Sequence, residues 1–127
     1  MRDLNAHTTA ARFIAAVAAQ DAAALRSFFA PEAEVYWHNT NERFSAAEYI
    51  TANCKYPGTW QADAERVETA GETVIAVYRV WNEDASFHAV AFIRFAGERI
   101  ANLHEYWGED GPPPSWRAGL GLGKPIR

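Results

Sequence analysis

The sequence has very little cysteine: Cys54 is its one thiol, so no disulfide can form within the chain. The N-terminus also lacks a basic region followed by an apolar run and a small-residue cleavage site, the pattern of a secretory leader. Both absences predict a cytoplasmic location. An apolar run long enough to cross a bilayer is missing as well, which predicts no membrane partner.

The sequence also lacks a large excess of charge of either sign. Twelve Lys and Arg against sixteen Asp and Glu leave a net charge of -4, spread along the sequence. Without a basic surface to gather phosphate groups, the protein is not expected to bind nucleic acid. With 49% hydrophobic and 22% charged residues, the chain is too apolar to be disordered. Its 127 residues suffice for one domain, which needs neither a metal nor a disulfide to fold.

Aromatic residues, in contrast, are abundant: five Trp, five Tyr and seven Phe. Either the core is rich in aromatic side chains, or rings line a pocket.

The first half of the chain has helical periodicity. Apolar residues at intervals of three and four predict a helix over residues 8–20 and a second, short helix that opens at Asp21 and ends before Pro31. Residues 33–39 are β-rich and predict a strand. Ser45 and the glutamate three residues later form a capping box, which predicts a third helix to about residue 55.

After Gly58 the period changes from 3.6 to 2. The short turns between the apolar segments predict an antiparallel meander of four strands, at 59–69, 73–82, 85–95 and 99–107. Residues 108–127, with three consecutive prolines, are predicted to be an extended tail without a further element. Helices followed by a meander predict an α+β fold with three helices on one face of a curved sheet.

Two of the predicted strands are apolar on both faces. Val90 and Phe92, for example, lie on the opposite side from Ala89 and Ala91. Three short helices can cover one face only, so the other predicts a homodimer through the sheet. The alternative is a sheet covered by the chain's own tail. We also expect the tail to pack against the body, because Trp116 is costly to leave in water.

Several short motifs, in their order and spacing, resemble the nuclear transport factor 2-like superfamily, and most closely its SnoaL-like branch. The resemblance covers nearly the whole chain. The residues on which the resemblance rests are Gln20 with Asp21, the run 25–34 that contains Phe28-Phe29-Ala30-Pro31, and the runs 35–38, 92–95, 97–100 and 105–107. It implies a cone-shaped cavity between three helices and the concave face of an antiparallel or mixed, cystatin-like sheet, and frequent homodimers through the opposite face.

The resemblance does not imply one chemistry, because the superfamily includes isomerases, cyclases, hydrolases, dehydratases and proteins that only bind a ligand. Many SnoaL-like enzymes carry an acid just ahead of the Phe-Arg-Phe run, where this sequence has Ala91, and an Asp after the last aromatic pair, where it has Gly108. Both departures count against an isomerase or cyclase of the usual type.

Histidines are therefore the predicted bases. Antiparallel pairing about the turn at 96–98 places His88 opposite Glu105 and Ala89 opposite His104. Glu105 would then fix one tautomer of His88 and raise its basicity. The alternative is a structural cross-strand pair at an interface or rim.

His38, beside Trp37 at a strand end, is a second candidate base at the mouth of the cavity; otherwise it is a partly exposed loop residue. The three histidines lack the close spacing of a known metal site, so no metal is predicted. The candidates for ligand contact, which could also be core or surface residues, are Trp37, Trp60, Asp63, Tyr78, His104 and Trp107; Trp81 is a further ring candidate.

The sequence thus predicts a small dimeric protein that binds a small apolar or aromatic molecule in a cone-shaped cavity. It is either a carrier or an isomerase, cyclase, hydratase or dehydratase that uses a histidine base and no cofactor. The alternative is a structural or protein-interaction module with a filled cone. A cavity of several hundred Å³ would favour ligand binding.

Overall fold

The computed structural model describes residues 3–127. Its main helices are α1 (Asp3–Ala19), α2 (Ala22–Phe28) and α3 (Ala46–Lys55). Asp21 caps α2 by accepting a hydrogen bond from the backbone N–H of Ala24. The predicted capping box of α3 is present in full. Among the helices of residues 3–127, none is long and apolar enough to span a membrane.

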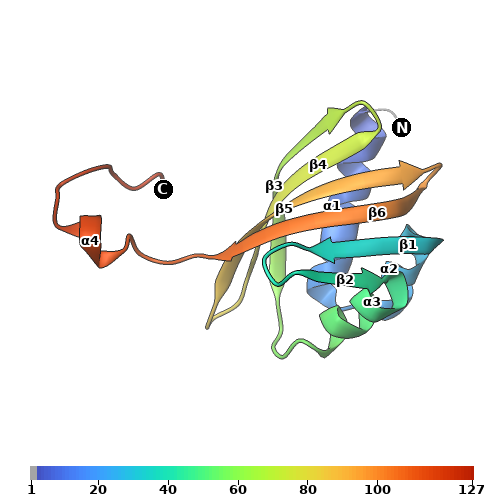
Figure 1. The fold of residues 1–127 in the computed structure, drawn as a ribbon, viewed down its shortest axis with the longest axis horizontal. Coiled ribbons are helices and arrows are strands. Elements are labelled where there is room, and N and C mark those ends of the chain that lie inside the picture. Colours follow the sequence, from blue (N-terminus) through green and yellow to red (C-terminus); the bar gives the residue numbers. More distant parts are fainter. Residues whose placement is uncertain (1–2) are drawn as a thin grey trace.

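A six-stranded sheet forms the other layer, in the order β2-β1-β6-β5-β4-β3. Its strands are β1 (Phe29–Trp37), β2 (Glu42–Ser45), β3 (Gln61–Ala70), β4 (Thr73–Trp81), β5 (Ser86–Ala96) and β6 (Arg99–Glu109). Strands β3 to β6 form the predicted meander, and β1 joins it parallel to β6. Figure 1 shows the three helices gathered against one side of the curved sheet. The predicted α+β architecture is confirmed.

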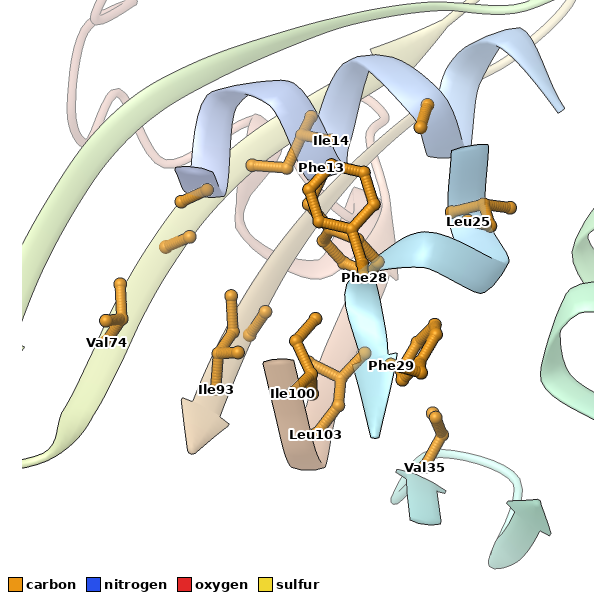
Figure 2. Close-up of a cluster of buried hydrophobic side chains, with 14 of the residues drawn as sticks. Phe13, Ile14, Leu25, Phe28, Phe29, Val35, Val74, Ile93, Ile100 and Leu103 are labelled. Atoms are coloured by element: carbon orange, nitrogen blue, oxygen red, sulfur yellow. The ribbon is translucent and has the colours of Figure 1, made fainter. Parts of the chain in front are cut away.

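The helices and the sheet enclose an aromatic and aliphatic core. Phe13 of α1 makes edge-on ring contacts with Phe28 and Phe29, at centroid distances of 5.5 and 5.8 Å. Figure 2 shows Phe13 and Phe28 between α1 and the sheet, above Ile100 and Leu103 of β6, with Phe29 beside these two aliphatic residues. Burial of such side chains contributes about 1.5–3 kcal/mol each, which fixes the helices on this face.

Strands β5 and β6 pair antiparallel, as predicted, but the predicted register is wrong. His88 lies opposite Gly108, three residues beyond Glu105, and Ala89 lies opposite Trp107. The hairpin turn is tight, with Ala96 paired to Arg99, and a bulge follows. Because side chains alternate along a strand, a shift by an odd number of residues moves a side chain to the other face. His88 and Glu105 therefore lie on opposite faces of the sheet.

The helices lie on one face of the sheet, which we call the helical face, and we call the opposite face the open face. The helical face carries Tyr78, Ala89 and Glu105. The open face carries His88 and Val90, which flank Ala89 along β5. Both faces of β4 and β5 are apolar, as the sequence predicted. On the open face Phe92 is 38% exposed and Tyr106 is 46% exposed.

The C-terminal segment departs from its prediction. Strand β6 continues to Glu109, and Ser115–Ala118 form the short helix α4, which was not expected. The expected packing of the tail against the body is also wrong: Trp116 is 72% exposed and Ile126 is 93% exposed. Figure 1 shows the segment projecting from the sheet beyond β6. The prolines at 112–114 cannot extend β6, because proline has no backbone N–H to donate to the sheet. The last residue, Arg127, nevertheless contacts Glu65 of β3.

Candidate functional site

A cavity of about 270 Å³ opens between α3 and the helical face of the sheet, and we call it the Glu105 cavity. Its wall is almost wholly apolar and aromatic. It is lined by Val17, Trp37, Tyr49, Ala52, Asn53, Tyr56, Tyr78, Val80, Phe87, Ala89, Glu105 and Trp107. Small-molecule sites in proteins have this composition, with a few polar groups set among rings.

Glu105 is the buried carboxyl of this cavity, with 3% of its surface exposed. Strand β6 holds it between Trp37 on β1 and Ala91 on β5, its neighbours in the sheet. The indole Nε1–H of Trp37 donates to Oε1 over 3.1 Å, and the hydroxyl of Tyr78 donates to Oε2. Each carboxylate oxygen therefore has one neutral donor, which fixes its position.

Burial dominates the electrostatics of this group. It raises the pKa of Glu105, and the hydrogen bonds from Tyr78 and Trp37 oppose that shift in part. Burial and the nearby Glu105 carboxyl raise the pKa values of Tyr78 and Tyr49 well above the ordinary value for a phenol. The tyrosines thus stay protonated donors, while the carboxyl is set for proton exchange nearer to neutrality than an exposed glutamate.

Side-chain bonds between α1 and α3 hold the cavity wall. Asn53 Nδ2 donates to the carbonyl of Val17 over 3.0 Å. Gln20, which ends α1 in the left-handed conformation (φ 53°), donates in turn to the carbonyls of Asn53 and Tyr56. The thiol of Cys54 donates to the carbonyl of Gln20 over 3.3 Å. Cys54 thus has a packing role beside the cavity, in line with its expected place on the helix.

Four residues singled out in the sequence meet in this cavity: Trp37, Tyr78, Glu105 and Trp107. Trp60 lies outside the lining but stacks on Tyr56, with the ring centroids 5.4 Å apart. The remaining candidates, which are His38, Asp63, His88 and His104, do not line the cavity. Trp81 also lies elsewhere, with the Arg79 guanidinium 4.5 Å from its ring centroid.

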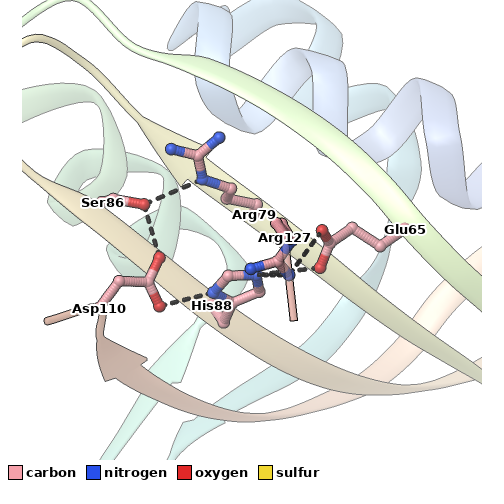
Figure 3. A network of polar contacts seen from close by, with 6 residues as sticks. All are labelled: Glu65, Arg79, Ser86, His88, Asp110 and Arg127. Carbon is pink, nitrogen blue, oxygen red and sulfur yellow. Dashed lines mark hydrogen bonds and ion pairs between the residues drawn. The ribbon is translucent and has the colours of Figure 1, made fainter. Parts of the chain in front are cut away.

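His88 belongs to a polar network on the open face (Figure 3). Its Nδ1 lies 2.5 Å from Asp110 Oδ1, and its Nε2 lies 3.0 Å from Glu65 Oε1. Arg127 contacts the same glutamate over 3.5 Å and so ties the end of the chain to β3. Burial by itself would raise the pKa of Asp110, but hydrogen bonds from Ser86 and His88 outweigh it and lower that pKa. Asp63 lines the depression beside this network.

The other two histidines are stacked on the open face. His38 Nε2 lies 2.9 Å from His104 Nδ1. The ring of His104 stacks on Tyr36 at 4.3 Å, and that of His38 stacks on Tyr106 at 4.4 Å. Burial, together with His38, lowers the pKa of His104. Within residues 3–127, no three His, Cys, Asp or Glu side chains are arranged to hold a metal ion.

Sequence reasoning missed the cavity residues contributed by α3 and the loop after it. Tyr49 makes edge-on ring contacts with Trp37 at 6.0 Å, and Asn53 and Tyr56 follow on the same side. The spacing of 49, 53 and 56 is that of one helix face and was the available signal. Phe87 was recognised as apolar but not as lining, because only the register shows which strand positions meet the cavity.

The fold matches many solved structures. A candidate ketosteroid isomerase from Kribbella flavida has a TM-score of 0.79 at 20% identity, over 96% of this chain and 91% of that one. A nuclear transport factor 2-like protein of unknown function from Burkholderia xenovorans has a TM-score of 0.78 at 17% identity, over 98% of both chains. A candidate SnoaL-like polyketide cyclase from Shewanella denitrificans has a TM-score of 0.69 at 12% identity, over 84% and 92%.

At these identities the likeness shows the fold alone. No curated protein matches the sequence significantly. The model of the SnoaL-like domain family matches residues 10–103, which is most of the chain. Because this match spans well over half of the chain, and the α+β fold agrees with it, this chain belongs to the SnoaL-like domain family.

Proposed function

We propose that the protein binds a small, mainly apolar organic molecule in the Glu105 cavity, and that Glu105 transfers a proton to or from it. The reaction class is that of an isomerase, cyclase, hydratase or dehydratase that works without a cofactor. One observation carries the proposal: a buried carboxyl, held by two neutral donors, lines a cavity of about 270 Å³ whose other walls are rings, aliphatic side chains and the amide of Asn53.

General acid–base catalysis needs a group that titrates near the working pH and can reach the ligand. Burial raises the pKa of Glu105 toward that range, and its side chain lines the cavity. The candidate histidines His38, His88 and His104 are bases by chemistry, but they lie on the open face of the sheet. The acid–base role predicted for a histidine therefore passes to Glu105 in this proposal.

The alternative, a structural module with a filled cone, has less support. A filled cone would leave no room for a ligand, whereas the Glu105 cavity has space for one.

Exchange of carbonyl α-protons tests the proposal without a known substrate. Cyclohexanone in D₂O loses its α-proton NMR signal when a base removes these protons. We expect the protein to accelerate this loss and Glu105→Gln to slow it by about a hundredfold or more, the usual scale for a lost general base.

His88→Gln is the matched control for this exchange, because it removes an imidazole on the open face, away from the cavity. It should keep the wild-type rate. Full activity of Glu105→Gln, or a loss confined to His88→Gln, would contradict the proposed role of Glu105.

We also propose a homodimer through the open face, as expected from the sequence. Its support is the exposed rings of Phe92 and Tyr106, beside the stacked pair His38 and His104. The exposed Trp116 and its apolar neighbours on the C-terminal segment add surface that a second copy would cover. A cytoplasmic location stays a prediction.

A further inference from the structure

The carboxyl of Glu105 lacks a positive partner. Its two side-chain contacts are the neutral donors Trp37 and Tyr78. No Lys, Arg or His is among the described residues that line the cavity. An ionised carboxylate buried in this way carries an uncompensated charge, which is costly in a medium of low polarity. A ligand that brings the missing positive charge into the cavity would remove this cost.

The rings of the cavity favour the same kind of ligand. Six of its lining residues are aromatic: Trp37, Tyr49, Tyr56, Tyr78, Phe87 and Trp107. Aromatic faces attract a cation through the ring quadrupole, most strongly for Trp, and cages of this composition are the common recognition mode for alkylated ammonium groups. The attraction grows when the cation is desolvated, as it would be between α3 and the sheet.

The hydrogen bonds to Glu105 further narrow the chemical class of the ligand. Both oxygens of Glu105 already accept a hydrogen bond, so the site is short of positive charge and not of donors. An ammonium group whose protons are replaced by methyl groups supplies that charge and makes apolar contact with the rings. An anion would meet the carboxylate at close range without a compensating side chain, so anionic ligands are disfavoured.

From the carboxylate, the rings and the absence of a lining cation, we propose that the Glu105 cavity binds a small organic cation with an alkylated ammonium group, in preference to a neutral molecule of the same shape. This rests on the proposed function, since it assumes that the cavity takes a ligand. The cation would keep Glu105 ionised, and thus ready to act as a base.

Two isosteric probes test the charge preference directly. Choline and 3,3-dimethylbutan-1-ol have the same shape and differ only in a quaternary nitrogen in place of a quaternary carbon. Their dissociation constants would be measured by NMR titration on the wild-type protein, on Glu105→Gln and on Glu83→Gln. The last variant removes a carboxylate of the exposed turn between β4 and β5, so it matches the change in net charge away from the cavity.

We expect wild type and Glu83→Gln to bind choline at least tenfold more tightly than the alcohol, and Glu105→Gln to lose this preference. Equal affinities in wild type would overturn the cation proposal and leave the proposed ligand site standing. Binding of neither probe would count against both. A preference that survives in Glu105→Gln would also overturn the proposal, because the charge would then be recognised elsewhere. The wild-type comparison needs no variant to fold.

Discussion

Replacing Tyr78 by Phe tests the hydrogen-bonded environment of Glu105. The change removes the hydroxyl that donates to Oε2 and keeps the ring that lines the cavity. Hydrogen bonds to charged groups contribute about 1.5–3 kcal/mol, and those between neutral groups about 0.5–1.5 kcal/mol. Trp37 continues to hold the other oxygen. We therefore expect Tyr78→Phe to lower the free energy of unfolding by about 1.5–3 kcal/mol where Glu105 is ionised.

The loss should depend on pH with a definite sign. At low pH Glu105 is protonated and the lost bond is a neutral one, so the cost is small. It should grow as the pH rises through the pKa of Glu105, which burial raises. Urea unfolding followed by tryptophan fluorescence across a pH series measures this difference. In thermal melts, roughly 4 °C of Tm per kcal/mol is expected for a chain of this size.

Tyr106→Phe provides the matched control. Tyr106 is on the open face, exposed and stacked on His38, so losing its hydroxyl should change stability by no more than about 0.5 kcal/mol. If Tyr78→Phe is as stable as wild type at every pH, or if its cost does not rise with pH, the described arrangement around Glu105 is refuted.

The remaining predictions concern charge, assembly and packing. Burial raises the pKa of Glu105, so the contribution of this carboxyl to stability is full at low pH and is lost as the pH rises through the folded-state pKa. The side chain of Glu105→Gln does not titrate. In urea unfolding, this variant should therefore gain stability relative to wild type over that pH range. Val90→Glu would bury an unpaired charge in the proposed dimer, so light scattering should show monomers. A retained dimer would mean that the contact between the two copies lies elsewhere. Phe13→Ala should lower the free energy of unfolding by about 3–5 kcal/mol, because the Phe13 ring is 1% exposed and lies between Phe28 and Phe29. Denaturant titration measures this loss, and a value below about 1 kcal/mol would contradict the described core.

Local signals in the sequence were sufficient for most of the fold. The capping box at Ser45 and the cap at Asp21 locate two helix starts because they are hydrogen bonds within four residues. Strand β2 was missed, since its four residues offer too short a pattern and its pairing with β1 depends on the intervening turn. The parallel pairing of β1 with β6 was not predicted, because it joins segments far apart in sequence and no local pattern reports it.

The site was less predictable, because it depends on register. Glu105 was a candidate only as a partner for His88, and the tight turn with its bulge separates them onto opposite faces. The rings of Trp37, Tyr78 and Trp107 were found because large aromatic residues on strands are few enough to stand out. Tyr49 was assigned to its helix but not to the cavity, since helical periodicity alone does not say what a buried face meets.

Titration of the indole signals with cyclohexanone tests most directly whether the Glu105 cavity is a binding site. Trp37 and Trp107 line the cavity, whereas Trp116 is exposed on the C-terminal segment and serves as an internal reference. In ¹H–¹⁵N spectra, the indole resonances of Trp37 and Trp107 are predicted to shift together and saturate with one dissociation constant, while that of Trp116 stays in place. Shifts that do not saturate, or that affect Trp116 as much as Trp37 and Trp107, would contradict a ligand site in this cavity.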